Sequence, residues 1–156
     1  MANAPWLDER EQAAWRGFLR MSFDVDARIR RQLQRDAGLS DADYAVLVAL
    51  SESDDGRLRI TELARFLAWE KSRMSHQLRR MEGRGLVARQ ECETDARGAF
   101  AVITPEGRKA IEAVAPLHVA EVRRSFIDLL SRKQLDALVD IAETVLAGHE
   151  SEACDG

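Results

Sequence analysis

The chain has 156 residues, of which 46% are hydrophobic, and its formal net charge is −4. This length suits one domain, or one lobe joined to a small helical lobe, with enough apolar residues for a packed core. Two cysteines, Cys92 and Cys154, exclude a disulfide framework, and no set of residues has the spacing of a zinc site. We therefore expect no metal and no cofactor. Because no apolar run is long enough for a signal peptide or a membrane span, we expect a cytoplasmic protein without membrane contact.

The charge is distributed unevenly along the chain. Residues 57–109 hold 12 Lys and Arg against 7 Asp and Glu, a net charge of +5, so the remaining residues carry −9. A basic segment inside an acidic protein is the pattern expected for local binding to phosphates. The overall negative charge therefore does not argue against a nucleic-acid partner.

Residues 8–37 predict a long helix, because apolar residues recur at steps of three and four from Trp15 to Leu33. A second apolar stripe runs beside the first. A helix that is apolar on two sides packs against its own domain and also against a partner. Gly38 is expected to end this helix, and Ser40 to cap a second helix.

The middle of the chain contains a recognisable order of short elements. After a short strand at 58–60 we expect a helix, a turn, a helix, a strand, a charged turn and a strand. These are residues 61–67, 68–69, 70–81, 86–91, 94–98 and 99–103. This order is typical of a helix-turn-helix with a β-hairpin wing, which places a basic helix in the major groove of double-stranded DNA.

The spacing in the second of these helices predicts which face would contact DNA. Met74, Leu78 and Met81 lie at i, i+4 and i+7, so we expect them to be buried. Arginine can pair with both guanine acceptors, whereas serine and histidine make single contacts. We therefore expect base contacts from some outward residues and phosphate contacts from others: Ser72, Arg73, Ser75 and His76 on bases, Lys71 and Arg79 on phosphates. An ordinary solvated helix face is the alternative.

The C-terminal third predicts two more helices. Thr104 and Pro105 supply an N-cap and a first helical residue, and Pro116 is expected to bend this helix without breaking it. Ser131 and Gln134 form a capping box that opens the last helix. The flanking helices carry more apolar surface than one small lobe can bury, which predicts a homodimer.

These elements predict a mainly α fold with a small β-hairpin, in which a winged helix-turn-helix is flanked by dimerisation helices. The expected divisions are an N-terminal dimerisation helix, a DNA-binding lobe, C-terminal dimerisation helices and a disordered tail: residues 1–37, 38–104, 105–148 and 149–156.

Over residues 8–148 the chain resembles the MarR family of bacterial winged-helix regulators. The family's Asp-x-Arg, apolar strand and Leu-Thr-x-x-Gly pattern is matched by Asp95-Ala96-Arg97 and by Ala101-Val102-Ile103-Thr104-Pro105-Glu106-Gly107. Glu-Leu-Ala at 62–64 and Gly-Leu-Val at 85–87 also fit. The resemblance implies that Arg97 enters the minor groove and that Asp95 orients it.

Four residues depart from the family pattern, two of them conservatively: Ala101 and Ile103 replace the commoner valine and leucine. Ala68 stands where the turn often carries glycine, and Glu70 stands where a serine N-cap is usual. Glutamate is a poorer cap. Its charge would either lower the affinity for DNA or accept a hydrogen bond from a cytosine amino group. Trp69 is expected to fill the corner between the two helices, with contact to the DNA backbone as the alternative.

The resemblance also implies a small aromatic or phenolic effector, bound between the DNA-binding lobe and the dimer helices. Candidates for contact with it are Trp15, Phe18, Tyr44 and His118, although core packing is the ordinary role of such residues.

We therefore expect a sequence-specific transcriptional regulator, a ligand-responsive repressor that binds a pseudo-palindromic operator as a dimer. No Ser-His-Asp order, phosphate loop or metal set predicts catalysis, so we expect no enzyme. The alternative is a winged-helix interaction module, or a small-molecule sensor without direct repressor activity.

Overall fold

A computed structural model describes residues 6–91 and 98–154 of the chain. The predicted fold class is confirmed: the described part is mostly helical and contains a small antiparallel sheet. The helices are α1 (Glu9–Ala37), α2 (Asp41–Glu52), α3 (Ile60–Phe66), α4 (Lys71–Gly83), α5 (Pro105–Ser125), the 3-10 turn η1 (Ile127–Leu129) and α6 (Arg132–Cys154). The strands are β1 (Arg57–Arg59), β2 (Val87–Glu91) and β3 (Ala99–Ile103).

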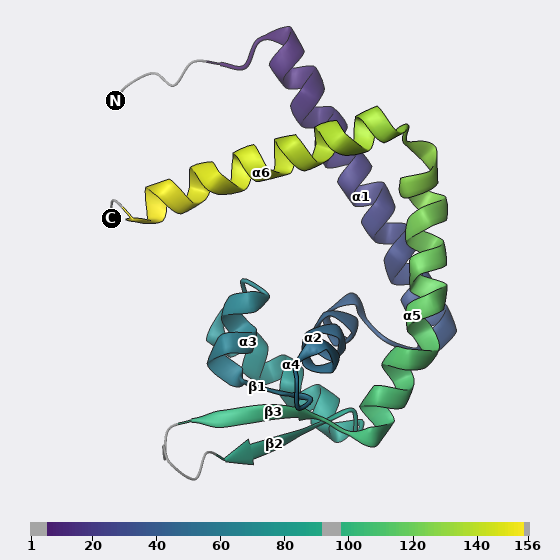
Figure 1. Cartoon of the computed structure of the whole chain (residues 1–156), viewed down its shortest axis with the longest axis vertical. Helices are drawn as coiled ribbons and strands as arrows, with labels where there is room; N and C mark the ends of the chain where they lie inside the picture. Colours follow the sequence, from purple (N-terminus) through teal and green to yellow (C-terminus); the bar gives the residue numbers. More distant parts are fainter. Residues whose placement is uncertain (1–5, 92–97, 155–156) are drawn as a thin grey trace.

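Three helices and the sheet form one lobe, which we call the winged lobe (α2, α3, α4, β1, β2 and β3). Figure 1 shows this lobe at one end of the molecule, with α1 and α5 running away from it side by side. The described side chains of α6 are almost all exposed. None of the helices in the described ranges is long and apolar enough to cross a membrane.

The core lies inside the winged lobe and at its junction with α1 and α5. Its fully buried members come from every helix of the lobe and from both flanking helices: Leu33, Leu39, Val46, Leu47, Leu50, Leu63, Met74, Leu78, Met81 and Val114. The apolar periodicity of the sequence therefore marks the core of the lobe correctly, because these positions recur at helical spacing.

The helix starts follow the predicted capping chemistry. Ser40 and Asp43 form a capping box at the start of α2, and the Thr104 hydroxyl accepts a hydrogen bond from the Gly107 amide. Ser131 and Gln134 form the predicted box before α6. α5 continues through Pro116 without a break, as the periodicity on both sides predicts.

The sheet contains one strand more than the hairpin alone, in the order β1-β3-β2. Residues directly opposite one another in an antiparallel pair share a face. Arg89 pairs with Ala101, and Ala101 is buried, so Arg89 lies on the inner face of the sheet, toward the helices. On the outer face, the guanidinium groups of Arg57 and Arg59 lie 5.1 and 5.3 Å from the centre of the Phe100 ring.

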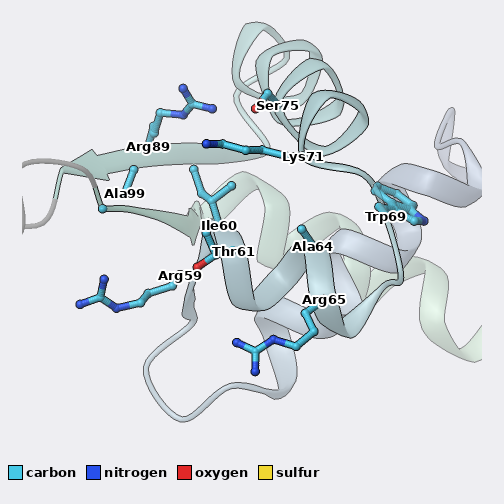
Figure 2. Close-up of a pocket in the computed structure, with 11 residues that line it drawn as sticks. Arg59, Ile60, Thr61, Ala64, Arg65, Trp69, Lys71, Ser75, Arg89 and Ala99 are labelled. Atoms are coloured by element: carbon cyan, nitrogen blue, oxygen red, sulfur yellow. The ribbon is translucent and has the colours of Figure 1, made fainter. Parts of the chain in front are cut away.

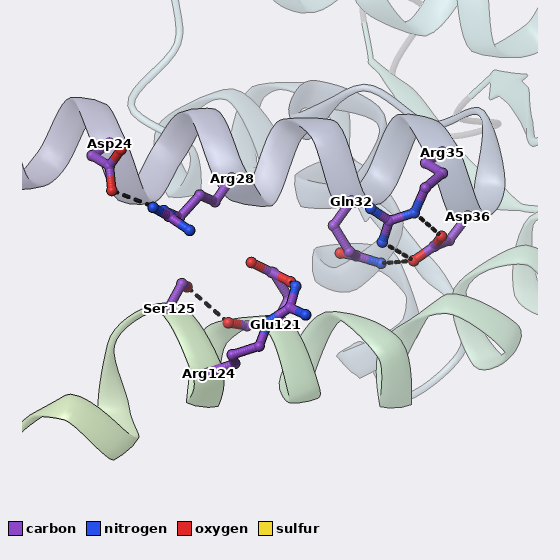
Figure 3. A network of polar contacts seen from close by, with 8 residues as sticks. All are labelled: Asp24, Arg28, Gln32, Arg35, Asp36, Glu121, Arg124 and Ser125. Carbon is purple, nitrogen blue, oxygen red and sulfur yellow. Dashed lines mark hydrogen bonds and ion pairs between the residues drawn. The ribbon is translucent and has the colours of Figure 1, made fainter.

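Charged side chains line the contact between α1 and α5 (Figure 3). Glu121 of α5 is buried, forms an ion pair with Arg124, and faces the α1 arginines Arg28 and Arg35. Arg28 itself pairs with Asp24 at 2.8 Å. Arg124, with Arg28 and Arg35 nearby, supplies the positive charge needed to bury the Glu121 carboxylate between two helices.

The C-terminal boundary predicted from the sequence is wrong. The segment 149–156 is expected to be a disordered tail, but α6 continues to Cys154. Gly148 is the only helix breaker near this end, and a single glycine costs about 1 kcal/mol relative to alanine in a helix. The residues after it, from His149 to Ala153, include good helix formers, so the helix propagates past the glycine.

Candidate nucleic-acid interface

The face of α4 predicted to be buried is buried. Met74 and Met81 are 0% exposed and Leu78 is 2% exposed. The opposite face is therefore open, and it carries five exposed side chains and one half-buried hydroxyl: Lys71, Ser72, Arg73, His76 and Arg79, with Ser75 partly covered. The structure thus places every α4 residue of the predicted interface on one side of a single helix.

The turn before α4 brings Trp69 under Arg73. Ala68 has a positive φ of 50°, which is the left-handed conformation that favours glycine at this position. Trp69 then packs against the core, as predicted from the sequence, and its amide donates to the Ala64 carbonyl at 2.8 Å. The Arg73 guanidinium lies 4.3 Å from the centre of the Trp69 ring, which is within range of a cation–π contact.

The amino-terminal end of α4 carries no side-chain cap. Glu70 is the N-cap residue, and its side chain makes no capping hydrogen bond. The first turn of α4 contains no acidic residue. Helix N-termini favour negative charge, because their first amides have no intrahelical acceptor. This end of α4 therefore offers uncapped amides to a phosphate, while the Glu70 carboxylate at the same end opposes it by charge.

A charged cleft of about 460 Å³ separates α4 and α3 from the sheet (Figure 2). Four cationic residues contribute to its lining, from four different elements or their ends: Arg59, Arg65, Lys71 and Arg89. The guanidinium of Arg59 itself lies over Phe100 on the outer face of the sheet. None of the described residues lining the cleft is acidic. Trp69, Thr61 and Ser75 add an aromatic ring and two hydroxyls. An anionic group such as a DNA phosphate would be stabilised there by charge and by hydrogen bonds.

Sequence reasoning missed three of these cations as site residues. Arg59, Arg65 and Arg89 count toward the basic segment, but nothing in the helix pattern selects them. The signal for Arg89 is strand alternation: it lies two residues after the buried Val87, so it shares the inner face.

The predicted wing-tip residues Asp95 and Arg97 lie outside the described residues. The strands on either side are described up to the pair Glu91 and Ala99.

The four candidate effector residues form two separate pairs. Trp15 and Phe18 stack in α1 with ring centres 5.8 Å apart, and each is about half exposed. Tyr44 of α2 and His118 of α5 meet with ring centres 4.3 Å apart. Residues of α1 between Met21 and Ile29 line one hollow together with Phe126, the residue that follows α5. The Trp15–Phe18 pair comes earlier in α1 and therefore lies past the C-terminal end of α5, away from His118.

His118 is the titratable member of the second pair. Its Nδ1 atom is buried and has no hydrogen-bond partner among the described residues. Burial lowers the pKa of His118 and raises that of Tyr44. Both side chains are therefore held in their neutral forms near neutral pH.

Nothing in the described ranges resembles a metal centre. Within residues 6–91 and 98–154, no three His, Cys, Asp or Glu side chains are grouped so that they could hold a metal ion.

Comparison with known proteins gives one consistent result. The model of the MarR family matches residues 37–98. AbsC, a MarR family transcriptional regulator from Streptomyces coelicolor, is 44% identical, with a TM-score of 0.88 over 95% of this chain and 99% of that one. Sco3205 from the same organism, solved in complex with DNA, is 39% identical, with a TM-score of 0.90 over 95% and 92%. The transcriptional regulator HosA from Escherichia coli O157:H7 is 29% identical over 69% of this chain and 78% of its own length.

Proposed function

Because the chain belongs to the MarR family of transcriptional regulators, we propose that it binds double-stranded DNA in a sequence-specific manner through α4. The observation that carries this proposal is the open polar face of α4 beside the charged cleft. The similarity to Sco3205, which was solved with DNA, supports it.

In this proposal α4 enters the major groove. Arg73, Ser72, Ser75 and His76 contact base edges, because they occupy the amino-terminal half of the open face. Lys71 and Arg79 contact phosphates, as do the arginines of the charged cleft. Asp95 and Arg97 of the wing act in the adjacent minor groove.

Trp69 holds the Arg73 guanidinium in place before DNA is bound. Stacking on the ring holds the guanidinium at the amino-terminal end of α4, so that less conformational entropy is lost on binding than from a freely rotating arginine. Trp69 thereby assists base recognition while it remains part of the core.

We further propose that the protein acts as a homodimer. Large apolar side chains are exposed along α1 and α6 of the single chain: Trp15, Phe18, Phe23, Val139, Ile141, Val145 and Leu146. A second copy would bury these side chains at an interface. Two α4 helices would then occupy successive major grooves, about 34–36 Å apart, which requires a pseudo-palindromic operator.

Repression by occupying the operator follows from this arrangement, and an effector would relieve it by changing the separation of the two winged lobes. A coupling of about 1–3 kcal/mol would change affinity about 5–150-fold. The unpartnered Nδ1 of His118, beside Tyr44, favours a phenolic effector, whose hydroxyl can donate or accept a hydrogen bond there. Trp15 and Phe18 belong to the dimer surface in this scheme. An interaction module or a sensor without repressor activity is the competing function, and it predicts no binding to DNA.

The test begins with selection of binding sites from random DNA, followed by affinity measurements over a salt series. Arg73→Ala should relax the base preference. Lys71→Ala should weaken binding to all sequences alike and reduce the salt slope by about 1. Lys133→Ala, which removes the same charge from α6, is the matched control and should change neither. Absence of DNA binding at low salt without effector would reject the proposal. A changed base preference with an unchanged slope for Lys71→Ala would show that the roles assigned along α4 are wrong.

A further inference from the structure

A buried polar cluster joins the recognition helix α4 to the junction of α1 and α2. Asp43 of α2 is 2% exposed, and Gln77 of α4 is 4% exposed. Gln77 Nε2 donates to Asp43 Oδ1 at 2.6 Å, and Arg84 Nη1 donates to Asp43 Oδ2 at 2.6 Å. Arg84 Nη2 also donates to the Gly38 carbonyl at 2.8 Å, and the Ser40 amide donates to Asp43 Oδ2 at 2.9 Å.

The cluster supplies the donors that a buried carboxylate requires. Burial alone would raise the pKa of Asp43, but hydrogen bonds from the Ser40 amide and from Arg84 outweigh it and hold the pKa below its ordinary value. Asp43 is therefore ionised at neutral pH. An ionised side chain at this depth is tolerated only with such partners, so the bonds to α4 are strong and directional.

Hydrogen bonds can fix the rotation of a helix about its axis more tightly than apolar packing does, because they depend on direction. The apolar face of α4 could accommodate a small rotation by changes in rotamers, since methionine is flexible. A rotation of about 15° would move a side-chain end lying about 6 Å from the axis of α4 by about 1.5 Å. Contacts to base edges must be held to within about 0.5 Å. Base recognition therefore needs the rotation of α4 to be fixed by something stiffer than its core contacts.

We infer that Asp43, Gln77 and Arg84 are positioning residues for base recognition, which fix the rotation of α4 against α2 without contacting DNA. Gln77 anchors the middle of α4 to Asp43, and Arg84, the C-cap residue, anchors the C-terminal end of the helix. Because Gly38 is the C-cap of α1, Arg84 also fixes α4 relative to the helix that leaves the winged lobe. The inference rests on the proposed DNA binding.

Reversing one hydrogen bond tests this role. Asp43→Asn leaves one acceptor oxygen for donors from Gln77, Arg84 and Ser40, and Gln77→Glu places a second carboxylate beside Asp43. In the double variant, the new amide of residue 43 can donate to the new carboxylate of residue 77, while its oxygen still accepts from Arg84. The double variant also keeps the net charge.

The measurement is the ratio of affinities for the selected operator and for a shuffled sequence, with the thermal midpoint measured in parallel. Each single variant should lose about tenfold in this ratio, the discrimination that one well-placed bidentate base contact supplies. Its salt slope on shuffled DNA should stay unchanged. The double variant should recover the ratio. Ile111→Val, a core change in α5, is the matched control that lowers the midpoint and keeps the ratio.

Two results are informative against the inference. If the single variants fold, lose thermal stability and keep the full ratio, the cluster only stabilises the fold and the inference is wrong. If a single variant does not fold, Arg84→Lys replaces it, because lysine keeps the charge but has one nitrogen in place of the two that reach Asp43 and Gly38. An unchanged ratio for Arg84→Lys would also overturn the inference. Wild-type protein that selects no sequence at all would instead reject the proposed function.

Discussion

Two helical glycines should respond in opposite directions to the same substitution. Gly107 lies in the first turn of α5, and a Cβ there would come closer than 3.0 Å to the Leu86 carbonyl oxygen and 3.1 Å from Ile103 Cγ1. Gly83 ends α4, and a Cβ there would meet no atom within 4 Å. Gly107→Ala therefore overpacks the junction of α5 with the sheet, whereas Gly83→Ala enters open space.

The magnitude follows from what must move. The neighbour at Gly107 is backbone, so α5 has to shift away from Leu86. That shift strains two hydrogen bonds, from the Thr104 amide to the Leu86 carbonyl at 3.2 Å and from the Thr104 hydroxyl to the Gly85 carbonyl at 2.6 Å. Overpacking costs about 1–3 kcal/mol and each hydrogen bond about 1 kcal/mol, while alanine regains about 1 kcal/mol of helix propensity. We expect Gly107→Ala to destabilise the fold by about 3 kcal/mol.

Thermal unfolding followed by circular dichroism measures the difference. A chain of this size shifts its midpoint by about 2–4 °C per kcal/mol, so Gly107→Ala should lower it by about 6–12 °C. Gly83→Ala should leave it unchanged or raise it slightly. All variants are compared at one protein concentration, because the midpoint of a dimer depends on concentration. An unchanged or raised midpoint for Gly107→Ala would refute the close approach of α5 to Leu86.

Two further changes test local features of the winged lobe. Ala68→Gly should raise the free energy of unfolding by about 0.5–1 kcal/mol, because it removes the strain of the positive φ, and urea titration would detect it. A lower value would show that Ala68 is not strained. His118 is expected to make the protein acid-sensitive, because burial lowers its pKa in the folded state below 6.5. As the pH drops from 7, the unfolded chain therefore binds the proton first. The free energy of unfolding falls until the pH reaches the folded-state pKa. His118→Gln should lose less stability between pH 7 and pH 5 in urea titrations, and an equal loss would refute this contribution of His118.

The parts of the fold that could be predicted are those set by local chemistry. The helix starts at Ser40, Thr104 and Ser131 follow from hydroxyl caps, because the cap and its acceptor lie within one turn of chain. The orientation of α4 follows from Met74 and Leu78, because one face of an amphipathic helix must be buried.

The parts that could not be predicted depend on distances between elements. Gln77 and Arg84 reach Asp43 across 34 and 41 residues of chain, and helical periodicity assigns both to a polar face without naming a partner. Trp15 lies on an apolar stripe of α1, and His118 lies on one of α5. Periodicity shows that the two stripes can pack together, but it does not show which residues of one helix lie beside which residues of the other. The separation of Trp15 and His118 in the structure depends on where α5 ends against α1.

The charge of the basic segment has two different uses in the structure. Arg84 is bound to Asp43, Arg80 donates to Gln77 at 2.6 Å, and Arg57 is paired with Asp55 at 2.5 Å. Only Arg84 of these three ties α4 to another element, since Arg80 bonds within α4 and Arg57 pairs with a residue two positions before it. Lys71, Arg79 and Arg89 instead line the charged cleft or the open face of α4, where a phosphate can approach. The net charge of +5 therefore overstates the number of phosphate contacts. Arg84 uses its charge inside the protein, where it fixes α4, and only the remaining cations are open to DNA.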